Sequence, residues 1–173
     1  MNVNTKSIVV LTAICLVVAV ALAGVNFVTA PIIADADAAA AFEACFKVMP
    51  TASDFENVDL TDGLPATVTS VYKETTGQGY AVKITTKGYE TGLVILCGIN
   101  SEGKITGTTI VSGNETPSIG GQCGKPAYSD QYLGLSDDLS SVEGISGATL
   151  TSSAYKSAVS DALKAVSILE GRQ

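Results

Sequence analysis

An uncharged apolar run near the N-terminus is the feature that most constrains this chain. Ile8 to Val25 reads "IVVLTAICLVVAVALAGV" and contains no charged residue. A helix of about 20 apolar residues matches the roughly 30 Å hydrocarbon core of a bilayer and satisfies its backbone polar groups internally. The sequence therefore predicts a transmembrane anchor at residues 8–30, preceded by a short N-terminus at residues 1–7.

The charges that flank this run predict its orientation. Lys6 lies just before the run, and the next basic residue is Lys47. By the positive-inside rule, the N-terminus stays in the cytoplasm and the chain after Pro31 is extracytoplasmic. A cleaved signal peptide is the alternative, because "ALAG" and "VTA" supply the small residues of a cleavage site. The run exceeds the roughly 7–15 apolar residues of a signal peptide, which favours a retained single-pass anchor in the cell (inner) membrane.

Composition narrows the possible partners and cofactors. The length of 173 residues favours one compact domain beyond the anchor. A net charge of −7 without clustered Lys and Arg argues against nucleic acid as a partner. The chain has no histidine, and the cysteines beyond the anchor are widely spaced, so we expect no metal site. One disulfide between two of these three cysteines would leave a thiol over.

The segment after the anchor divides into a helix and a connection. Pro31 is expected to interrupt the helix, because proline removes a backbone donor. The alanine-rich residues up to Pro50 then predict a stalk helix at residues 31–50. Residues 51–65 are acidic and rich in turn-forming residues, which predicts an exposed connection.

The remaining sequence predicts an α+β domain, and we place the domain at residues 51–173. Alternating or continuous apolar patterns predict four strands, and the short turns between them indicate antiparallel pairing. A long loop and a closing helix with an alanine-rich face follow, and the helix is expected to pack on the sheet. The strands are expected at 66–74, 80–89, 91–99 and 104–112, the loop at 113–141 and the helix at 151–169.

The sequence "GISGATLTSSAYKSAV" has the composition of a phosphate site. Small residues and hydroxyl side chains stand where the last helix is expected to begin. The first backbone N–H groups of a helix lack intrahelical partners, and the helix dipole favours an anion there. Small residues allow a ligand to approach the backbone closely. The plainer alternative is that Ser146, Thr149 or Thr151 only caps the helix.

A second stretch, "NETPSIGGQ", pairs with this one behind a single N-terminal apolar helix. Together they closely resemble the G subunit of the Rnf ion-translocating electron-transport complex. They are also similar to the related C subunit of the sodium-pumping NADH:quinone oxidoreductase. The resemblance covers essentially the whole chain. The family usually has aspartate where Glu143 stands, and glycine and leucine where Ser118 and Ile119 stand.

The resemblance implies a covalently bound FMN. In the family, a flavin transferase joins FMN through its phosphate to the last threonine of the S/T-G-A-T motif, which is Thr149 here. We expect Glu115 to orient the loop that closes over the flavin ring rather than to transfer protons. The other expected cofactor-binding residues are Ser146, Gly147, Ala148, Thr151 and Ser152 around the phosphate, and Thr116, Ile119 and Gly120 around the ring.

The implied function is electron transport. The chain would be the electron-carrying subunit of a membrane-bound, ion-translocating ferredoxin:NAD oxidoreductase, and would turn over no substrate alone. Its partners would be the membrane, the other integral and peripheral subunits, and the flavin transferase. Three alternatives stay open: the quinone-reductase C subunit, a stand-alone extracytoplasmic flavin carrier, and a structural domain in which "SGAT" is only a cap.

Overall fold

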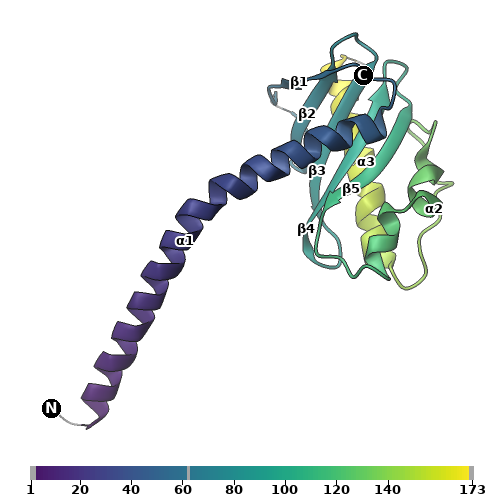
Figure 1. The fold of residues 1–173 in the computed structure, drawn as a ribbon. Coiled ribbons are helices and arrows are strands. Elements are labelled where there is room, and N and C mark those ends of the chain that lie inside the picture. The colour runs from purple at the N-terminus through teal and green to yellow at the C-terminus, as the bar shows by residue number, and fades with distance from the viewer. Residues whose placement is uncertain (1–2, 62, 172–173) are drawn as a thin grey trace. The chain divides into compact units, whose positions relative to one another are not determined.

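This computed structural model describes residues 3–61 and 63–171, so the first two residues of the expected N-terminal segment lie outside it. The described chain forms two compact units, Met1–Ala39 and Ala40–Gln173. The first helix, α1 (Val3–Val48), runs from the first unit into the second (Figure 1).

The expectation that Pro31 interrupts the helix is wrong. α1 continues through Pro31 to Val48. A proline inside a helix removes one backbone hydrogen bond but keeps a helical φ, and a long helix accommodates this loss. The alanine-rich turns on the C-terminal side also have a high helix propensity.

The N-terminal unit contains a segment suited to a bilayer. Among the described residues, Lys6–Ile33 is the stretch of helix long and apolar enough to cross a membrane. Its large apolar side chains are exposed, from Ile8 to Ile33. Such a surface is unfavourable in water and favourable in lipid.

The second unit contains an antiparallel sheet of five described strands in the order β1-β2-β3-β4-β5. Each strand pairs with its sequence neighbour, which confirms the expected α+β class and antiparallel pairing. The short first strand was not expected, because "FENV" lacks a continuous apolar or alternating pattern. The strands are β1 (Phe55–Val58), β2 (Val68–Glu74), β3 (Gly79–Lys87), β4 (Thr91–Asn100) and β5 (Ile105–Ser112).

Helices cover both faces of this sheet. The last helix, α3 (Thr149–Leu169), packs on one face through a core that includes Ile95 and Cys97 of β4. The final turns of α1 pack on the other face, where Leu96 joins a second core. Adjacent residues of a strand point to opposite faces, so the continuous apolar run of β4 fills both cores. Figure 1 shows the sheet between α3 and the end of α1.

A glycine pair allows α1 to approach the sheet closely. Gly98 of β4 lies opposite Gly107 of β5 in the register. A Cβ atom built on Gly107 would lie 2.9 Å from the backbone oxygen of Val48. Thr106 donates a hydrogen bond to that same oxygen at 2.7 Å, which satisfies a carbonyl at the helix C-terminus.

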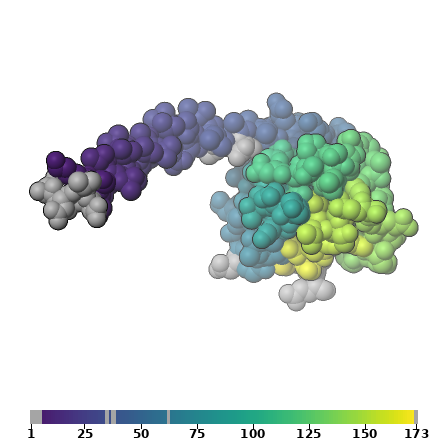
Figure 2. Space-filling view, turned by 90° about the horizontal axis from the view of Figure 1, so that it is seen from below, coloured from purple at the N-terminus to yellow at the C-terminus, as the bar shows by residue number. Residues whose placement is uncertain are grey.

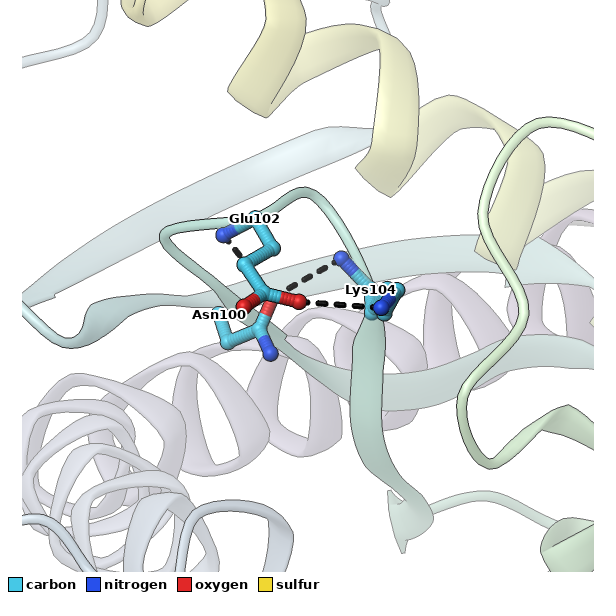
Figure 3. A network of polar contacts seen from close by, with 3 residues as sticks. All are labelled: Asn100, Glu102 and Lys104. Carbon is cyan, nitrogen blue, oxygen red and sulfur yellow. Dashed lines mark hydrogen bonds and ion pairs between the residues drawn. The ribbon is translucent and has the colours of Figure 1, made fainter.

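The turn between β4 and β5 is closed by side-chain contacts (Figure 3). Asn100 Oδ1 accepts hydrogen bonds from the backbone N–H groups of Glu102, at 3.0 Å, and Lys104, at 2.9 Å. The Lys104 ammonium forms an exposed ion pair with the Glu102 carboxylate. These contacts fix the hairpin that places β5 beside β4.

The long connection after β5 has its own local structure. It contains η1 (Gly120–Gly124), α2 (Pro126–Ser129) and η2 (Asp130–Tyr132). Tyr128 and Tyr132 form edge-to-face contacts with each other, and Tyr128 with Tyr155 of α3. This buried aromatic cluster fixes the connection against the first half of α3.

A buried carboxylate fixes the turn between β2 and β3. Glu74 accepts hydrogen bonds from the backbone N–H groups of Ser53, Thr76 and Gln78, and from the Thr76 hydroxyl. The Gln78 N–H contributes most to lowering the pKa of Glu74, to about 2, and burial opposes it. The folded pKa is below the unfolded value of about 4.3, so this stabilisation is present above the unfolded value and is lost as pH falls through about 2.

Replacing this carboxylate tests its role. Glu74→Gln should lower the melting temperature of the full chain in detergent by several degrees at pH 7, because an amide N–H₂ group then faces other donors. The difference from the wild type should shrink between pH 4 and pH 2, as the wild-type carboxylate becomes protonated. Circular dichroism melts measure both effects, with the exposed Glu56→Gln as control. A constant difference across this pH range would contradict the account.

Candidate functional site

The first turn of α3 is open to a ligand. Gly147 has a φ of +83°, a conformation that favours glycine, and it turns the chain into the helix. Ala148 occupies the N-cap position, and no side chain among the described residues caps the helix by a hydrogen bond. The alternative that a hydroxyl of this motif only caps α3 is therefore wrong. The uncapped N–H groups and the helix dipole provide a site for an anion.

A pocket of about 410 Å³ lies at this helix start. Its volume falls within the range of about 300–1,000 Å³ typical of small-molecule sites. Three segments meet around it: the β3–β4 turn, the loop after β5, and the beginning of α3. Figure 2 shows these segments, in teal, green and yellow-green, adjoining on one face of the second unit. The lining residues expected from the sequence are Glu115, Thr116, Ile119, Gly120, Gly147, Ala148, Thr149 and Thr151.

Glu115 connects the three segments. Its Oε2 accepts a hydrogen bond from the Thr151 hydroxyl at 2.6 Å, and its Oε1 accepts one from the Glu90 backbone N–H at 3.2 Å. A Cβ atom on Gly88 or Gly120 would collide with this carboxylate. Two glycines therefore leave the space that the carboxylate fills.

Two of the expected phosphate-binding residues lie outside the pocket lining. Ser146 is exposed on the turn before α3. Ser152 is buried, and its hydroxyl accepts a hydrogen bond from the Ile145 N–H at 3.0 Å. The Ser152 hydroxyl also lies 3.6 Å from Cys123 Sγ of η1. The buried Ser152 side chain therefore stabilises the turn that precedes α3.

The cysteines of the second unit are free thiols in the described structure, including Cys97 and Cys123. Burial raises the pKa of the Cys123 thiol, and the Ser152 contact opposes this shift in part. Burial also raises the pKa of Cys97. Both thiols therefore stay protonated at neutral pH, and a protonated thiol is a poor nucleophile and a poor metal ligand.

Sequence reasoning missed two residues that line the pocket, Tyr89 and Leu150. Tyr89 was expected to end a strand, but β3 ends at Lys87 and Tyr89 lies in the turn. Both side chains are 65% exposed, and Ile119 beside them is 47% exposed. Large apolar side chains at a pocket rim suit a flat apolar ligand. The sequence signal that could have identified Tyr89 was the presence of an aromatic residue within the glycine-flanked turn "KGYETG".

The arrangement suits a ligand with a phosphate at one end and an apolar ring at the other. The N-terminus of α3 favours the phosphate. Thr149 is exposed at this position, so its hydroxyl is accessible. The rim residues Tyr89, Ile119 and Leu150 supply apolar surface for a ring. The residues present therefore fit a flavin mononucleotide.

This fold and pocket define a class: an α+β domain that offers the open start of its last helix to a phosphate-bearing cofactor. The sequence profile of the FMN-binding domain matches residues 88–164. The match begins in the β3–β4 turn and includes every segment that lines the pocket.

Three relatives extend the similarity over most of the chain. The G subunit of the Na⁺-translocating ferredoxin:NAD⁺ oxidoreductase complex of Acetobacterium woodii is 33% identical, over 87% of this chain and 85% of the relative. The G subunit of the proton-translocating complex of Clostridium ljungdahlii is 25% identical, over 93% and 90%. The G subunit of the ion-translocating oxidoreductase complex of Methanosarcina acetivorans is 31% identical, over 75% and 76%. The chain belongs to this family of G subunits, which confirms the resemblance seen in the sequence.

The close fit of the Glu115 carboxylate generates a stability prediction. Gly120→Ala should lower the free energy of unfolding by about 1–3 kcal/mol, because its Cβ would crowd Glu115 and lie 2.8 Å from Thr151 Oγ1. Gly121→Ala is the matched control, since its Cβ would approach no described atom closer than 3.4 Å. Urea unfolding of the full chain in detergent measures both. Equal losses in the two variants would contradict the packing account.

Proposed function

We propose that this chain carries FMN joined by a phosphoester to Thr149 and serves as the electron-carrying subunit of an ion-translocating ferredoxin:NAD⁺ oxidoreductase complex. The observation that carries the proposal is the uncapped start of α3, where an exposed threonine hydroxyl lies beside free helix N–H positions and a pocket. The names of the relatives and the match to the FMN-binding domain support the same cofactor and complex.

Different residues around the pocket hold the phosphate and the ring of the cofactor. Thr149 Oγ1 forms the ester, and the first N–H groups of α3 donate hydrogen bonds to the phosphate oxygens. Gly147 and Ala148 leave room for the phosphate next to the backbone. Thr116 and the backbone of Ile119 and Gly120 face the ring, and the side chains of Ile119, Tyr89 and Leu150 cover its apolar surface.

FMN, when bound, supplies reversible acceptance and release of electrons. The protein positions the ring and determines its potential. A covalent bond keeps the cofactor at high effective concentration at the site, so that it is not lost from an extracytoplasmic domain. We expect the subunit to carry electrons through this cofactor without turning over a substrate by itself.

The membrane arrangement forms part of the proposal. Residues 8–30 form a single-pass anchor, residues 1–7 stay in the cytoplasm, and residues 51–173 form the extracytoplasmic FMN domain. The stalk at residues 31–50 joins the two through the C-terminal half of α1. The anchor also brings the subunit to the integral subunits of its complex, and a flavin transferase installs the cofactor.

Flavin fluorescence after denaturing electrophoresis tests the attachment. The full chain, co-expressed with a flavin transferase, should give a fluorescent band. Thr149→Ala should abolish the band, because the hydroxyl that forms the ester is then missing. Thr149→Ser is the matched control, since it restores a hydroxyl at the same position.

The choice of variants separates attachment from folding. Thr151→Val removes a neighbouring hydroxyl that lines the pocket, and should leave a fluorescent band because Thr149 is intact. A band that persists in Thr149→Ala would contradict the assignment. A wild-type chain that gives no band beside an active transferase would contradict the covalent cofactor altogether.

A further inference from the structure

We infer that the Glu115 carboxylate sets the reduction potential of the flavin, holding it more negative than the same pocket would with a neutral side chain. This inference rests on the proposed function, because it requires the ring to lie in the pocket. It concerns a different property of the site, since attachment depends on Thr149 and the potential depends on the charge beside the ring.

Glu115 is the charged side chain among the described residues that line the pocket. Its two oxygens each accept a hydrogen bond, one from the Thr151 hydroxyl and one from the Glu90 N–H. This pattern suits a carboxylate that acts as acceptor only, so the negative charge is kept at the pocket wall.

No Lys or Arg side chain forms an ion pair with Glu115 within the part of the chain that the structure describes. The ion pairs that join two described side chains are Lys104–Glu102 and Lys164–Asp161, and both lie outside the pocket lining. The partners of Glu115 are a neutral hydroxyl and a neutral N–H. They hold the charge in place and leave its sign unchanged.

The surrounding backbone prevents the carboxylate from moving away. Cβ atoms on Gly88 and Gly120 would collide with it, so it fits closely between these two backbone segments. Its side chain is half-buried, which weakens the screening that an exposed carboxylate would experience. The charge therefore has a fixed position next to the ligand volume.

The electrostatic consequence follows from the sign of the charge. An electron added to a ring in this pocket brings negative charge close to the carboxylate, and like charges repel. Glu115 thus makes reduction less favourable and lowers the potential. A more negative potential makes the bound flavin a stronger reductant, which suits a complex whose relatives are named for ferredoxin as the electron donor.

A redox titration of the flavin-loaded full chain tests this inference. Glu115→Gln should shift the midpoint potential to a less negative value than the wild type. Glutamine can keep both contacts, because its oxygen accepts from the Glu90 N–H and its amide donates to the Thr151 hydroxyl. Glu90→Gln is the matched control and should keep the wild-type potential, since the Glu90 side chain is exposed and lies outside the pocket lining.

The outcomes separate this inference from the proposed function. Equal potentials in flavin-loaded wild type and Glu115→Gln would overturn the inference and leave the attachment at Thr149 intact. A wild-type chain that binds no flavin would overturn both. If Glu115→Gln fails to fold, Glu115→Met removes the same charge and takes its place. Its potential should also be less negative than that of the wild type, and an equal value would overturn the inference.

Discussion

The open N-terminus of α3 is the constraint on which the rest of the site depends. A helix start within a folded domain normally receives a side-chain cap, and here the N-cap residue is Ala148. The positive φ of Gly147 turns the chain into the helix, and the residues of the first turn line the pocket. In the proposed function, the phosphate of the cofactor would take the place of the missing cap.

The fold holds this helix start in position from two sides. On the inner side, the Ser152 hydroxyl binds the Ile145 N–H and Tyr128 donates a hydrogen bond to the Ser152 carbonyl. On the outer side, Glu115 binds Thr151 and the β3–β4 turn. The motif therefore holds hydroxyls of two kinds: those of Thr149 and Thr151 line the pocket, and that of Ser152 binds the turn before the helix. One sequence of Ser and Thr residues serves both purposes.

Much of the fold could be predicted from the sequence, because its periodicity is strong. The four strands from β2 to β5 and the closing helix lie within a few residues of their expected bounds. β1 was missed because its pairing with β2 depends on tertiary packing of Phe55 rather than on a local pattern. The short helices after β5 were missed for a similar reason, since their turns depend on tyrosine contacts with α3.

The candidate site was predicted in part. The motif at the start of α3 predicted Gly147, Ala148, Thr149 and Thr151, because hydroxyl and small residues at a helix start have a direct physical role. The family resemblance implied Glu115, Thr116, Ile119 and Gly120. Tyr89 was missed because only the folded chain brings the β3–β4 turn to the start of α3, and Leu150 was missed because the motif was interpreted through its hydroxyl and small residues. The inward orientation of Ser152 also depends on the fold, because it follows from the 3.6-residue period of a helix that begins at Thr149.

The central claim is a covalent bond between one hydroxyl and one phosphate, and fragmentation mass spectrometry of the chain purified from its own membranes tests it most directly. The account predicts an added mass equal to FMN minus one water, localised to Thr149. The same mass localised to another residue, or a chain of unmodified mass from membranes whose complex is active, would contradict it.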